Sequence, residues 1–514
     1  MPWHSLILAL LSGGLLTLPF LSFSLGPAAW IALVPLLAAL YGRTVREGFL
    51  LGLIAGAVWG WGGIYWLHLV TVPGYLVLGL YLALYPALWS GWAAYLAVRR
   101  PGWLWWAAPA GWTALEYLRT YLFSGFPWNL LGTSQVENLP LIQIGSLAGV
   151  YGVGFLLVLV NAAIASAVVF LRAGKYSRDG VPARPGGIIP AVILLTAVLL
   201  YGRNALRTGE GEGRSEPLEV TVVQGAIRQD LKWVPGLAPS HFRTHLDLSL
   251  RALARSSDLV IWPESALPYY LEETPAVRKR LEELAAGGEA YLLVGGDYRD
   301  GTGQYNSAYL IPPAGGPRLR YDKVHLVPFG EYTPLKSIFP FLGRVVPWEE
   351  DFSPGRGYPV FTLTGFSPPR EPEPRIGILI CYEDIFPAPS RRMARAGADL
   401  LVNITNDAWF GRTPAPFQHS AASVFRAVEN RVYLARAANT GYSCVIDPRG
   451  RVIGEVVAGE GKRLFVPGWV TASVGRSGPP SFYRRHGDLF SWLCVFSALA
   501  ATLGALPFGS RRRD

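Results

Sequence analysis

The chain has 514 residues, of which 51% are hydrophobic and only 16% are charged, against about 25% in ordinary soluble domains. This composition excludes a disordered chain and a collagen-like repeat, and with only three Cys it also excludes a disulfide-stabilised mini-protein. Residues 1–205 hold only ten of the 46 Lys and Arg and four of the 36 Asp and Glu. We therefore expect a membrane protein that carries a large globular domain.

Apolar stretches long enough to cross a bilayer recur through the first 205 residues, and one more lies near the C-terminal end. No Lys or Arg precedes the first stretch and no clear cleavage site follows it, so we interpret it as an anchor and not as a signal peptide. The sequence predicts eight transmembrane helices, at 5–23, 27–42, 48–70, 73–98, 102–122, 143–171, 187–203 and 488–507.

Basic residues between these stretches predict the topology. Clusters of Lys or Arg follow the second, fourth, sixth and eighth stretches, whereas the loops after the first and third carry no charge. Both termini are then cytoplasmic, and residues 205–487 are extracytoplasmic. Most of the net charge of +10 lies in these clusters, so it does not indicate nucleic-acid binding. The clusters are Arg43 and Arg46; Arg99 and Arg100; Arg172, Lys175, Arg178 and Arg184; and Arg511, Arg512 and Arg513.

Two features interrupt the apolar pattern of the membrane region. Residues 121–140 are apolar but contain FPW at 126–128, which predicts either an interfacial loop with aromatic anchors or a lipid-facing re-entrant element at a substrate entrance. Glu116 and Arg119 lie at positions i and i+3 near the end of the fifth stretch. We interpret them as a structural ion pair and not as catalytic groups.

A soluble domain follows the seven helices of residues 1–204. We expect linkers at 205–217 and 476–487, a catalytic domain at 218–475 and a basic tail at 508–514. Short β-branched runs alternate with helical patterns, which predicts an α/β domain with a layered sheet. The expected strands are 218–223, 258–262, 291–294, 307–311, 376–380, 400–404, 443–446 and 451–457, and the expected helices include 275–286, 390–396 and 417–439.

Polar residues follow three of these strands at the point where each strand ends. Glu264 and Cys381 each follow one strand, and a polar cluster that includes Asn406 follows another. Because ligand sites collect at the carboxyl ends of strands in α/β sheets, we expect these side chains to share one site. Lys323 lies where a strand gives way to a loop, a context in which a lone Lys is more often a solvated charge.

Cys381 is the candidate nucleophile of this site. A thiol needs a base or a positive neighbour to become the attacking thiolate. Glu264 can accept the proton, and Lys323 can stabilise the oxyanion that forms. His325 and His419 are alternative bases, although neither lies in a stronger context than Glu264.

Other interpretations of the cysteines remain open. Cys381 can instead be a small buried hydrophobic residue, or it can form a disulfide with Cys444, which would silence the thiol. The Cys and His residues show no paired spacing, so no metal site is expected.

The motifs around these residues resemble the nitrilase, or carbon–nitrogen hydrolase, superfamily, which uses a Glu–Lys–Cys triad. Three blocks occur in the order of that family: WPES at 262–265, YDKVHLVPFGE at 321–331 and GILICYE at 377–383. The whole chain, including its membrane region, resembles the apolipoprotein N-acyltransferase family. Further matching segments are VQG at 223–225, KW at 232–233, NITNDAWFG at 403–411, ANTG at 438–441, and LEYLR at 115–119 followed by FPW at 126–128.

The resemblance implies a fold and a set of site residues. The fold is an α-helical membrane bundle joined to a four-layer αββα sandwich. In the triad, Glu264 is the general base, Lys323 is the oxyanion stabiliser and Cys381 is the nucleophile. The supporting residues are Glu331, Glu383 and Tyr382, whose backbone N–H is an oxyanion donor, and the substrate-contacting residues are Trp233 and Trp409.

The resemblance also implies a reaction in the bacterial inner membrane. The sn-1 acyl chain of a phospholipid, usually phosphatidylethanolamine, passes through a Cys thioester to the N-terminal amine of diacylglyceryl-cysteine in an apolipoprotein. No cofactor is implied, and we expect a monomer because no stretch carries a compelling dimerisation motif.

Two other functions compete with this one. The first is a membrane-tethered amidohydrolase of the nitrilase type that acts on a soluble amide. The seven preceding helices argue against it, since a tether needs only one. The second is a transporter, which would place charges at the membrane midplane, whereas nearly every charge here lies close to the end of a stretch.

Overall fold

The computed structural model describes residues 2–173, 186–207, 216–334, 336, 338, 351–367 and 369–506. The chain divides into two compact units: a helical unit of Met1–Arg207 with His486–Asp514, and an α/β unit of Thr208–Arg485. The second expected linker, at 476–487, contains a short helix, α14 (Phe482–His486). Outside the described residues lie the basic tail at 508–514, most of the linker at 205–217, and Lys175, Arg178 and Arg184.

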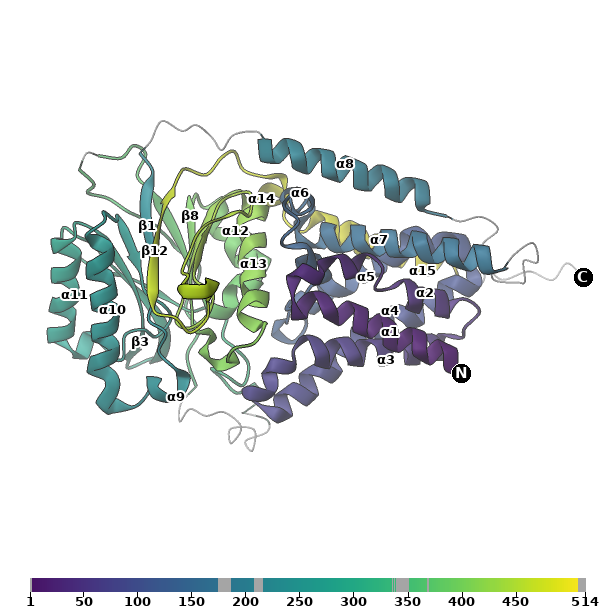
Figure 1. The fold of residues 1–514 in the computed structure, drawn as a ribbon, viewed down its shortest axis with the longest axis horizontal. Helices are drawn as coiled ribbons and strands as arrows, with labels where there is room; N and C mark the ends of the chain where they lie inside the picture. Colours follow the sequence, from purple (N-terminus) through teal and green to yellow (C-terminus); the bar gives the residue numbers. More distant parts are fainter. Residues whose placement is uncertain are drawn as a thin grey trace, which may run out of the picture. The chain divides into compact units, whose positions relative to one another are not determined.

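The helical unit is a bundle of apolar helices (Figure 1). A helix lies at each of the eight expected positions, with a 3-10 segment preceding the second one. Five of the described helical segments are long and apolar enough to cross a membrane, which supports a multi-pass membrane protein, while the count of eight stays a prediction. The helices are α1 (Trp3–Leu21), α2 (Val34–Leu40), α3 (Val45–Gly63), α4 (Val72–Arg99), α5 (Leu104–Tyr121), α7 (Gly145–Ala173), α8 (Ile188–Arg207) and α15 (Leu489–Gly504).

Small residues bring α3 and α4 into backbone contact. A Cβ added at Gly52 would lie 2.4 Å from the carbonyl oxygen of Pro86, and one added at Gly56 would lie 2.6 Å from that of Ala83. Side chains of any size at these positions would push the two helices apart. Such close approach is how membrane helices gain dispersion contacts when lipid provides no hydrophobic drive for association.

The segment at 121–140 folds into short helical turns and has two parts. Tyr121, Leu122 and Phe123 are exposed, whereas Trp128 and residues 129–135 are buried, so this second part is not lipid-facing. Glu116 accepts a hydrogen bond from the backbone N–H of Leu131 at 2.7 Å, and Arg119 donates to the carbonyl of Trp128 at 3.2 Å. Irregular backbone within a membrane protein needs such internal partners, which confirms a structural role for this pair.

The α/β unit contains two six-stranded sheets. The strand order is β12-β1-β2-β3-β4-β5 in the first sheet and β11-β10-β9-β8-β7-β6 in the second. The first sheet comprises β1 (Leu218–Gln224), β2 (Leu259–Ile261), β3 (Tyr291–Asp300), β4 (Gly303–Ile311), β5 (Leu319–Asp322) and β12 (Gly468–Val474). The second comprises β6 (Val360–Thr362), β7 (Arg375–Ile380), β8 (Leu400–Thr405), β9 (Tyr433–Ala438), β10 (Cys444–Ile446) and β11 (Val452–Glu455).

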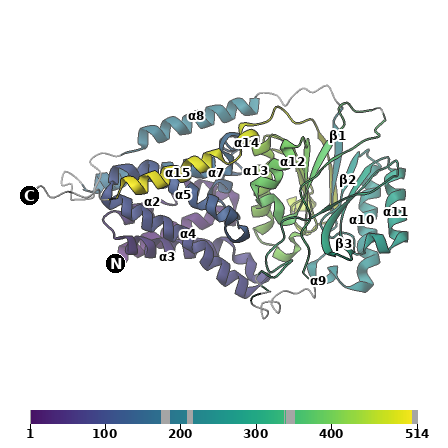
Figure 2. The same ribbon diagram turned by 180° about the vertical axis from the view of Figure 1, so that it is seen from behind.

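Helices cover the outer face of each sheet, which gives the expected αββα sandwich (Figure 2). The longer helices on the first sheet are α10 (Ala238–Leu253) and α11 (Pro275–Gly287), and those on the second are α12 (Pro387–Arg395) and α13 (Ala415–Asn430). One apolar core joins the inner faces of the two sheets, with Val222 and Ile261 from the first and Ile378 from the second.

The central strands of each sheet run parallel, and this arrangement places the site. β1, β2 and β3 are parallel neighbours in the first sheet, and β7, β8 and β9 are parallel neighbours in the second. Their carboxyl ends therefore lie along one edge of each sheet. The segments that follow β2, β7 and β8 carry the polar residues singled out by the sequence.

The eight expected strands are present, with ends shifted by up to six residues, but one expected helix is wrong in its second half. The helix predicted at 417–439 ends at Asn430, and Arg431 takes a left-handed conformation with φ of 55°. The chain then forms β9, whose residues are all buried in the sheet. A buried strand shows no alternation of polar and apolar residues, so the local pattern does not distinguish it from the helix before it.

Candidate active site

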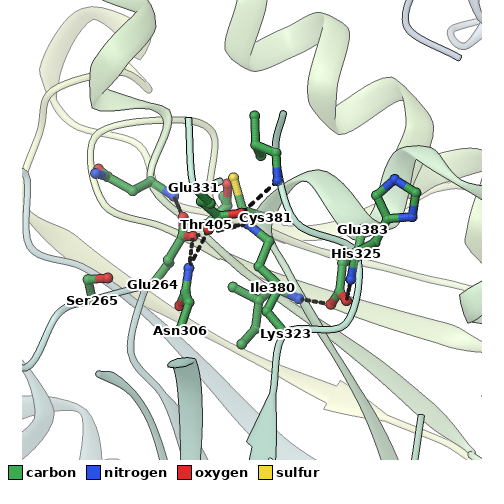
Figure 3. A network of polar contacts seen from close by, with 12 residues as sticks. Glu264, Ser265, Asn306, Lys323, His325, Glu331, Ile380, Cys381, Glu383 and Thr405 are labelled. Carbon is green, nitrogen blue, oxygen red and sulfur yellow. Dashed lines mark hydrogen bonds and ion pairs between the residues drawn. The ribbon is translucent and has the colours of Figure 1, made fainter. Parts of the chain in front are cut away.

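The structure brings together the three residues of the predicted triad. Glu264 follows β2, Lys323 follows β5, and Cys381 follows β7 directly. The Lys323 ammonium lies 3.6 Å from a carboxylate oxygen of Glu264. Figure 3 shows Glu264, Glu331 and Cys381 converging on one place. The two sheets thus contribute to a single site, because their strand ends meet there.

Glu264 is a buried carboxylate held by two donors. The Asn306 side-chain amide donates to Oε1 at 2.8 Å, and the backbone N–H of Asn406 donates to Oε2 at 2.9 Å. Asn306 lies on β4, and Asn406 follows β8 in the other sheet. The carboxylate is therefore held by donors from both sheets.

Lys323 is fully buried and paired with two carboxylates. Its ammonium donates to Glu331 Oε1 at 2.8 Å, while Glu331 Oε2 accepts from the backbone N–H of Val327 at 2.8 Å. Burial lowers the pKa of Lys323, but Glu331 and Glu264 outweigh it and raise the pKa above its usual value. Lys323 is accordingly a permanent cation, suited to stabilising negative charge and not to accepting a proton.

Cys381 occupies a strained position at the start of a short 3-10 turn, Cys381–Ile385. Its φ is 53°, in the left-handed region that a residue with a Cβ seldom adopts. Its side chain is partly exposed, and the thiol is free. Burial raises the pKa of this thiol, Glu264 raises it further, and Lys323 and a hydrogen bond with Thr405 only partly offset them. A thiol with its pKa raised in this way would need a base in order to act as a nucleophile.

Glu383 joins the Lys323 loop to the end of β7. Its carboxylate accepts hydrogen bonds from the backbone N–H groups of Val324, His325 and Ile380 and from the Tyr321 hydroxyl, at 2.8–3.0 Å. It is completely buried, and its bonds go to the scaffold of the site. The adjacent Tyr382 side chain is buried too, with its ring 5.1 Å from that of Phe386.

Trp233 and Trp409 are substantially exposed, at 44% and 38%. Trp233 directly follows Lys232, and Trp409 lies three residues after Asn406; both Lys232 and Asn406 contact Glu264. Lys232 donates to the backbone carbonyl of Glu264 at 3.0 Å, and the short turn Asp407–Phe410 follows Asn406. The two indoles therefore lie on segments that are fixed to Glu264.

The alternative bases do not fit this geometry. His419 is completely buried between two carboxylates, with its ring nitrogens 2.9 Å from Asp384 and 2.9 Å from Asp407. The ring of His325 packs on that of Phe386, with centroids 3.9 Å apart. Cys444 is a buried free thiol, so no disulfide silences Cys381. Among the residues that the structure describes, no cluster of three His, Cys, Asp or Glu is arranged for a metal.

Sequence reasoning missed two residues that contact the triad. Asn306 donates through one amide nitrogen to both Glu264 and Glu331, at 2.8 and 2.9 Å. Lys232, noted only as part of a motif, is buried beneath Glu264, and burial lowers its pKa to about 8. The motif at 232–233 could have identified Lys232 as a site residue, whereas nothing in the local sequence marks an Asn in the middle of a strand.

Comparisons with known proteins match both units of the chain. The carbon-nitrogen hydrolase model matches residues 219–464, and the model of the apolipoprotein N-acyltransferase N-terminal domain matches residues 12–163. An apolipoprotein N-acyltransferase of Geobacter metallireducens is 40% identical over 99% of this chain and 96% of its own length. The chain belongs to the apolipoprotein N-acyltransferase family.

Other members of this family match over a similar extent. The apolipoprotein N-acyltransferase of Brucella melitensis is 33% identical over 99% of this chain and 97% of its own length. A solved amidase from Nesterenkonia sp. is 22% identical, covers 53% of this chain and 93% of its own, and superposes with a TM-score of 0.38. The family match therefore confirms a membrane acyltransferase with a nitrilase-like α/β domain.

Proposed function

We propose that this protein transfers the sn-1 acyl chain of a phospholipid to the N-terminal amine of diacylglyceryl-cysteine in an apolipoprotein. The observation that carries the proposal is the cluster of Glu264, Lys323 and Cys381 in a chain that matches the family over its full length. Neither a cofactor nor a metal is needed, since a thiol, a base and a cation suffice for acyl transfer.

The first half of the reaction acylates Cys381. Glu264 removes the thiol proton, and the thiolate attacks the ester carbonyl carbon, whose oxygen becomes an oxyanion. Lys323 and the backbone N–H of Tyr382 stabilise this oxyanion. The tetrahedral intermediate then collapses with loss of the lysophospholipid alkoxide, which takes the proton from Glu264. Trp233 and Trp409 contact the substrate at the mouth of the site.

The second half transfers the acyl group to nitrogen. The neutral α-amine of the apolipoprotein attacks the thioester carbonyl and passes a proton to Glu264. The intermediate expels the thiolate of Cys381, which regains a proton from Glu264, and an amide remains. Glu331 holds Lys323 in place in both halves, because their 2.8 Å ion pair does not involve the substrate.

A membrane setting suits both substrates. Extracting an acyl chain from lipid costs about 0.8 kcal/mol per CH₂, so an enzyme embedded beside its substrates avoids a large penalty. We propose phosphatidylethanolamine as the donor. We also propose an extracytoplasmic α/β unit and cytoplasmic termini, because the arginine clusters indicate this topology. We also propose a monomer, since the glycine positions of α3 are already occupied by α4.

Intact mass spectrometry tests the reaction directly. The purified protein is mixed with a defined diacyl phospholipid without acceptor. We expect an added mass of one acyl group that neutral hydroxylamine removes and that the Cys381→Ala variant lacks. Lysophospholipid is measured in the same sample, so that a thioester hydrolysed quickly is still detected. If folded wild-type protein gives neither product and instead hydrolyses soluble amides, the acyltransferase proposal is wrong and the amidohydrolase is right.

A further inference from the structure

A closed ring of charged side chains lies beneath the nucleophile. The Arg436 guanidinium contacts Asp384 and Asp407, at 3.0 Å each, and the two ring nitrogens of His419 contact the same two carboxylates at 2.9 Å each. All four side chains are completely buried. They come from four segments: the turn after β7, the turn after β8, α13 and β9.

The ring is electrically balanced. Each ring nitrogen of His419 lies 2.9 Å from a carboxylate oxygen, an arrangement that favours the charged imidazole with two N–H groups. Two cations then face two anions, and no net charge is buried. A buried charge that loses its partner is strongly destabilising, so each member holds the others in position.

Asn403 connects this ring to the peptide that follows the nucleophile. Arg436 donates to Asn403 Oδ1 at 2.8 Å, and the Asn403 amide donates to the backbone carbonyl of Cys381 at 3.0 Å. Asn403 lies on β8 and is completely buried. The amide is thus fixed at both ends, with its oxygen on the ring and its nitrogen on Cys381.

The carbonyl of Cys381 and the N–H of Tyr382 belong to the same peptide unit. Because that unit is planar and trans, its carbonyl and its N–H point in opposite directions. Fixing the carbonyl therefore fixes the direction of the N–H that we propose as the oxyanion donor. The left-handed φ of Cys381 makes such fixing necessary, since a strained conformation persists only where its surroundings enforce it.

We infer that the Asp384–His419–Asp407–Arg436 ring acts through Asn403 to aim the Tyr382 N–H at the reacting carbonyl oxygen. Asn403 and Arg436 are then positioning residues for the oxyanion donor. This inference rests on the proposed acyl transfer, because it gives the Tyr382 N–H a role in that reaction.

The test compares two reactions of the same thiol in full-length protein. Acylation by a defined phospholipid forms an oxyanion, whereas alkylation of Cys381 by iodoacetamide requires the thiolate but no oxyanion. Both rates are measured by mass spectrometry in wild type and in Asn403→Leu, which keeps the side-chain volume but has no amide. We expect acylation to slow at least about tenfold, since removing an oxyanion donor outright costs about 10²–10³. Alkylation should stay within about threefold of the wild-type rate.

Ser443→Ala is the matched control. Ser443 is a buried residue that precedes β10, and its hydroxyl exchanges hydrogen bonds with the backbone of Ala438 on β9 without reaching Asn403. Both of its rates should match those of the wild type. If Asn403→Leu does not purify as a folded protein, Asn403→Ala, which removes the amide with a smaller loss of packing, takes its place.

The outcomes separate the inference from the proposed function. A parallel loss of acylation and alkylation in the Asn403 variant would show a general structural role and overturn the inference. An unchanged acylation rate would overturn it as well. Failure of the wild type itself to be acylated would instead contradict the proposed function, whatever the variants do.

Discussion

Glu264 takes part in every proton transfer of the proposed reaction. Its two oxygens accept hydrogen bonds from Asn306 and from the backbone of Asn406, so its position does not depend only on its ion pair with Lys323. Burial and Glu264 raise the pKa of Cys381, so we expect the proposed base to be needed to form the thiolate.

The variant Glu264→Gln should therefore remain folded but slow the acylation of Cys381 by at least about 10²-fold, as loss of a general base typically does. Rapid-mixing mass spectrometry with phospholipid measures this rate. Cys444→Ser is the control, since Cys444 is a buried thiol on β10. This variant should be acylated at Cys381 at the wild-type rate. Normal acylation in Glu264→Gln, or a dead Cys444→Ser, would contradict the triad assignment.

His419 should make the stability of the protein depend on pH. Burial and Arg436 lower its pKa, but Asp384 and Asp407 outweigh them and raise it above the usual value. A raised folded-state pKa means that the stabilisation is complete below the unfolded pKa of about 6.5 and is lost as pH rises through the folded one. The difference in apparent Tm between wild type and His419→Gln should shrink with rising pH. A difference independent of pH would mean that the imidazole is not charged.

The sequence predicts the triad correctly as a set of neighbours but not the groups that hold it. Glu264, Lys323 and Cys381 lie in recognisable motifs. Asn306 enters the site through strand pairing, because its carbonyl accepts the backbone N–H of Lys323 at 2.9 Å at the edge of β4 and β5. No local pattern encodes that pairing. The roles assigned to all these residues stay predictions until the variants are measured.

At the scale of elements, the contact of α3 with α4 sets how the membrane helices assemble. Gly56→Leu should force the helices apart, since its Cβ would overlap the backbone of Ala83. Overpacking of this kind costs about 1–3 kcal/mol, so the apparent Tm in detergent should fall. Gly14→Leu on α1 is the control, because nothing lies within 4 Å of a Cβ added there. Equal Tm values for the two variants would mean that α3 and α4 do not pack as described.

The sequence predicts where a strand ends when the apolar run is followed closely by a polar residue. The strands that precede Glu264 and Cys381 are predicted to within one residue of their observed C-terminal ends. The end of α13 is not, since Arg431 takes the left-handed conformation that usually marks a Gly. Strand β12 was also missed, although it pairs with β1 along its whole length. Its partner lies far away in sequence, so local pattern cannot reveal it.

At the scale of the whole molecule, we assign a different role to each of the two units. The helical unit gives residence in the membrane, where both proposed substrates are anchored by acyl chains. The α/β unit gives the chemistry, with each sheet providing part of the site: Glu264 and Lys323 from the first and Cys381 from the second. A change that shifts one sheet against the other should therefore impair the reaction even when it touches none of these residues.

The raised pKa of Cys381 has a consequence for the lifetime of the enzyme in the extracytoplasmic compartment that we propose. Oxidation to sulfenic acid and mixed-disulfide formation both proceed from the thiolate. A nucleophile that stays protonated between turnovers offers oxidants little to attack, while Glu264 still produces the thiolate when an ester is in place. In the oxidising compartment where we propose that it works, we expect the protein to keep its cysteine reduced without a reductant to restore it.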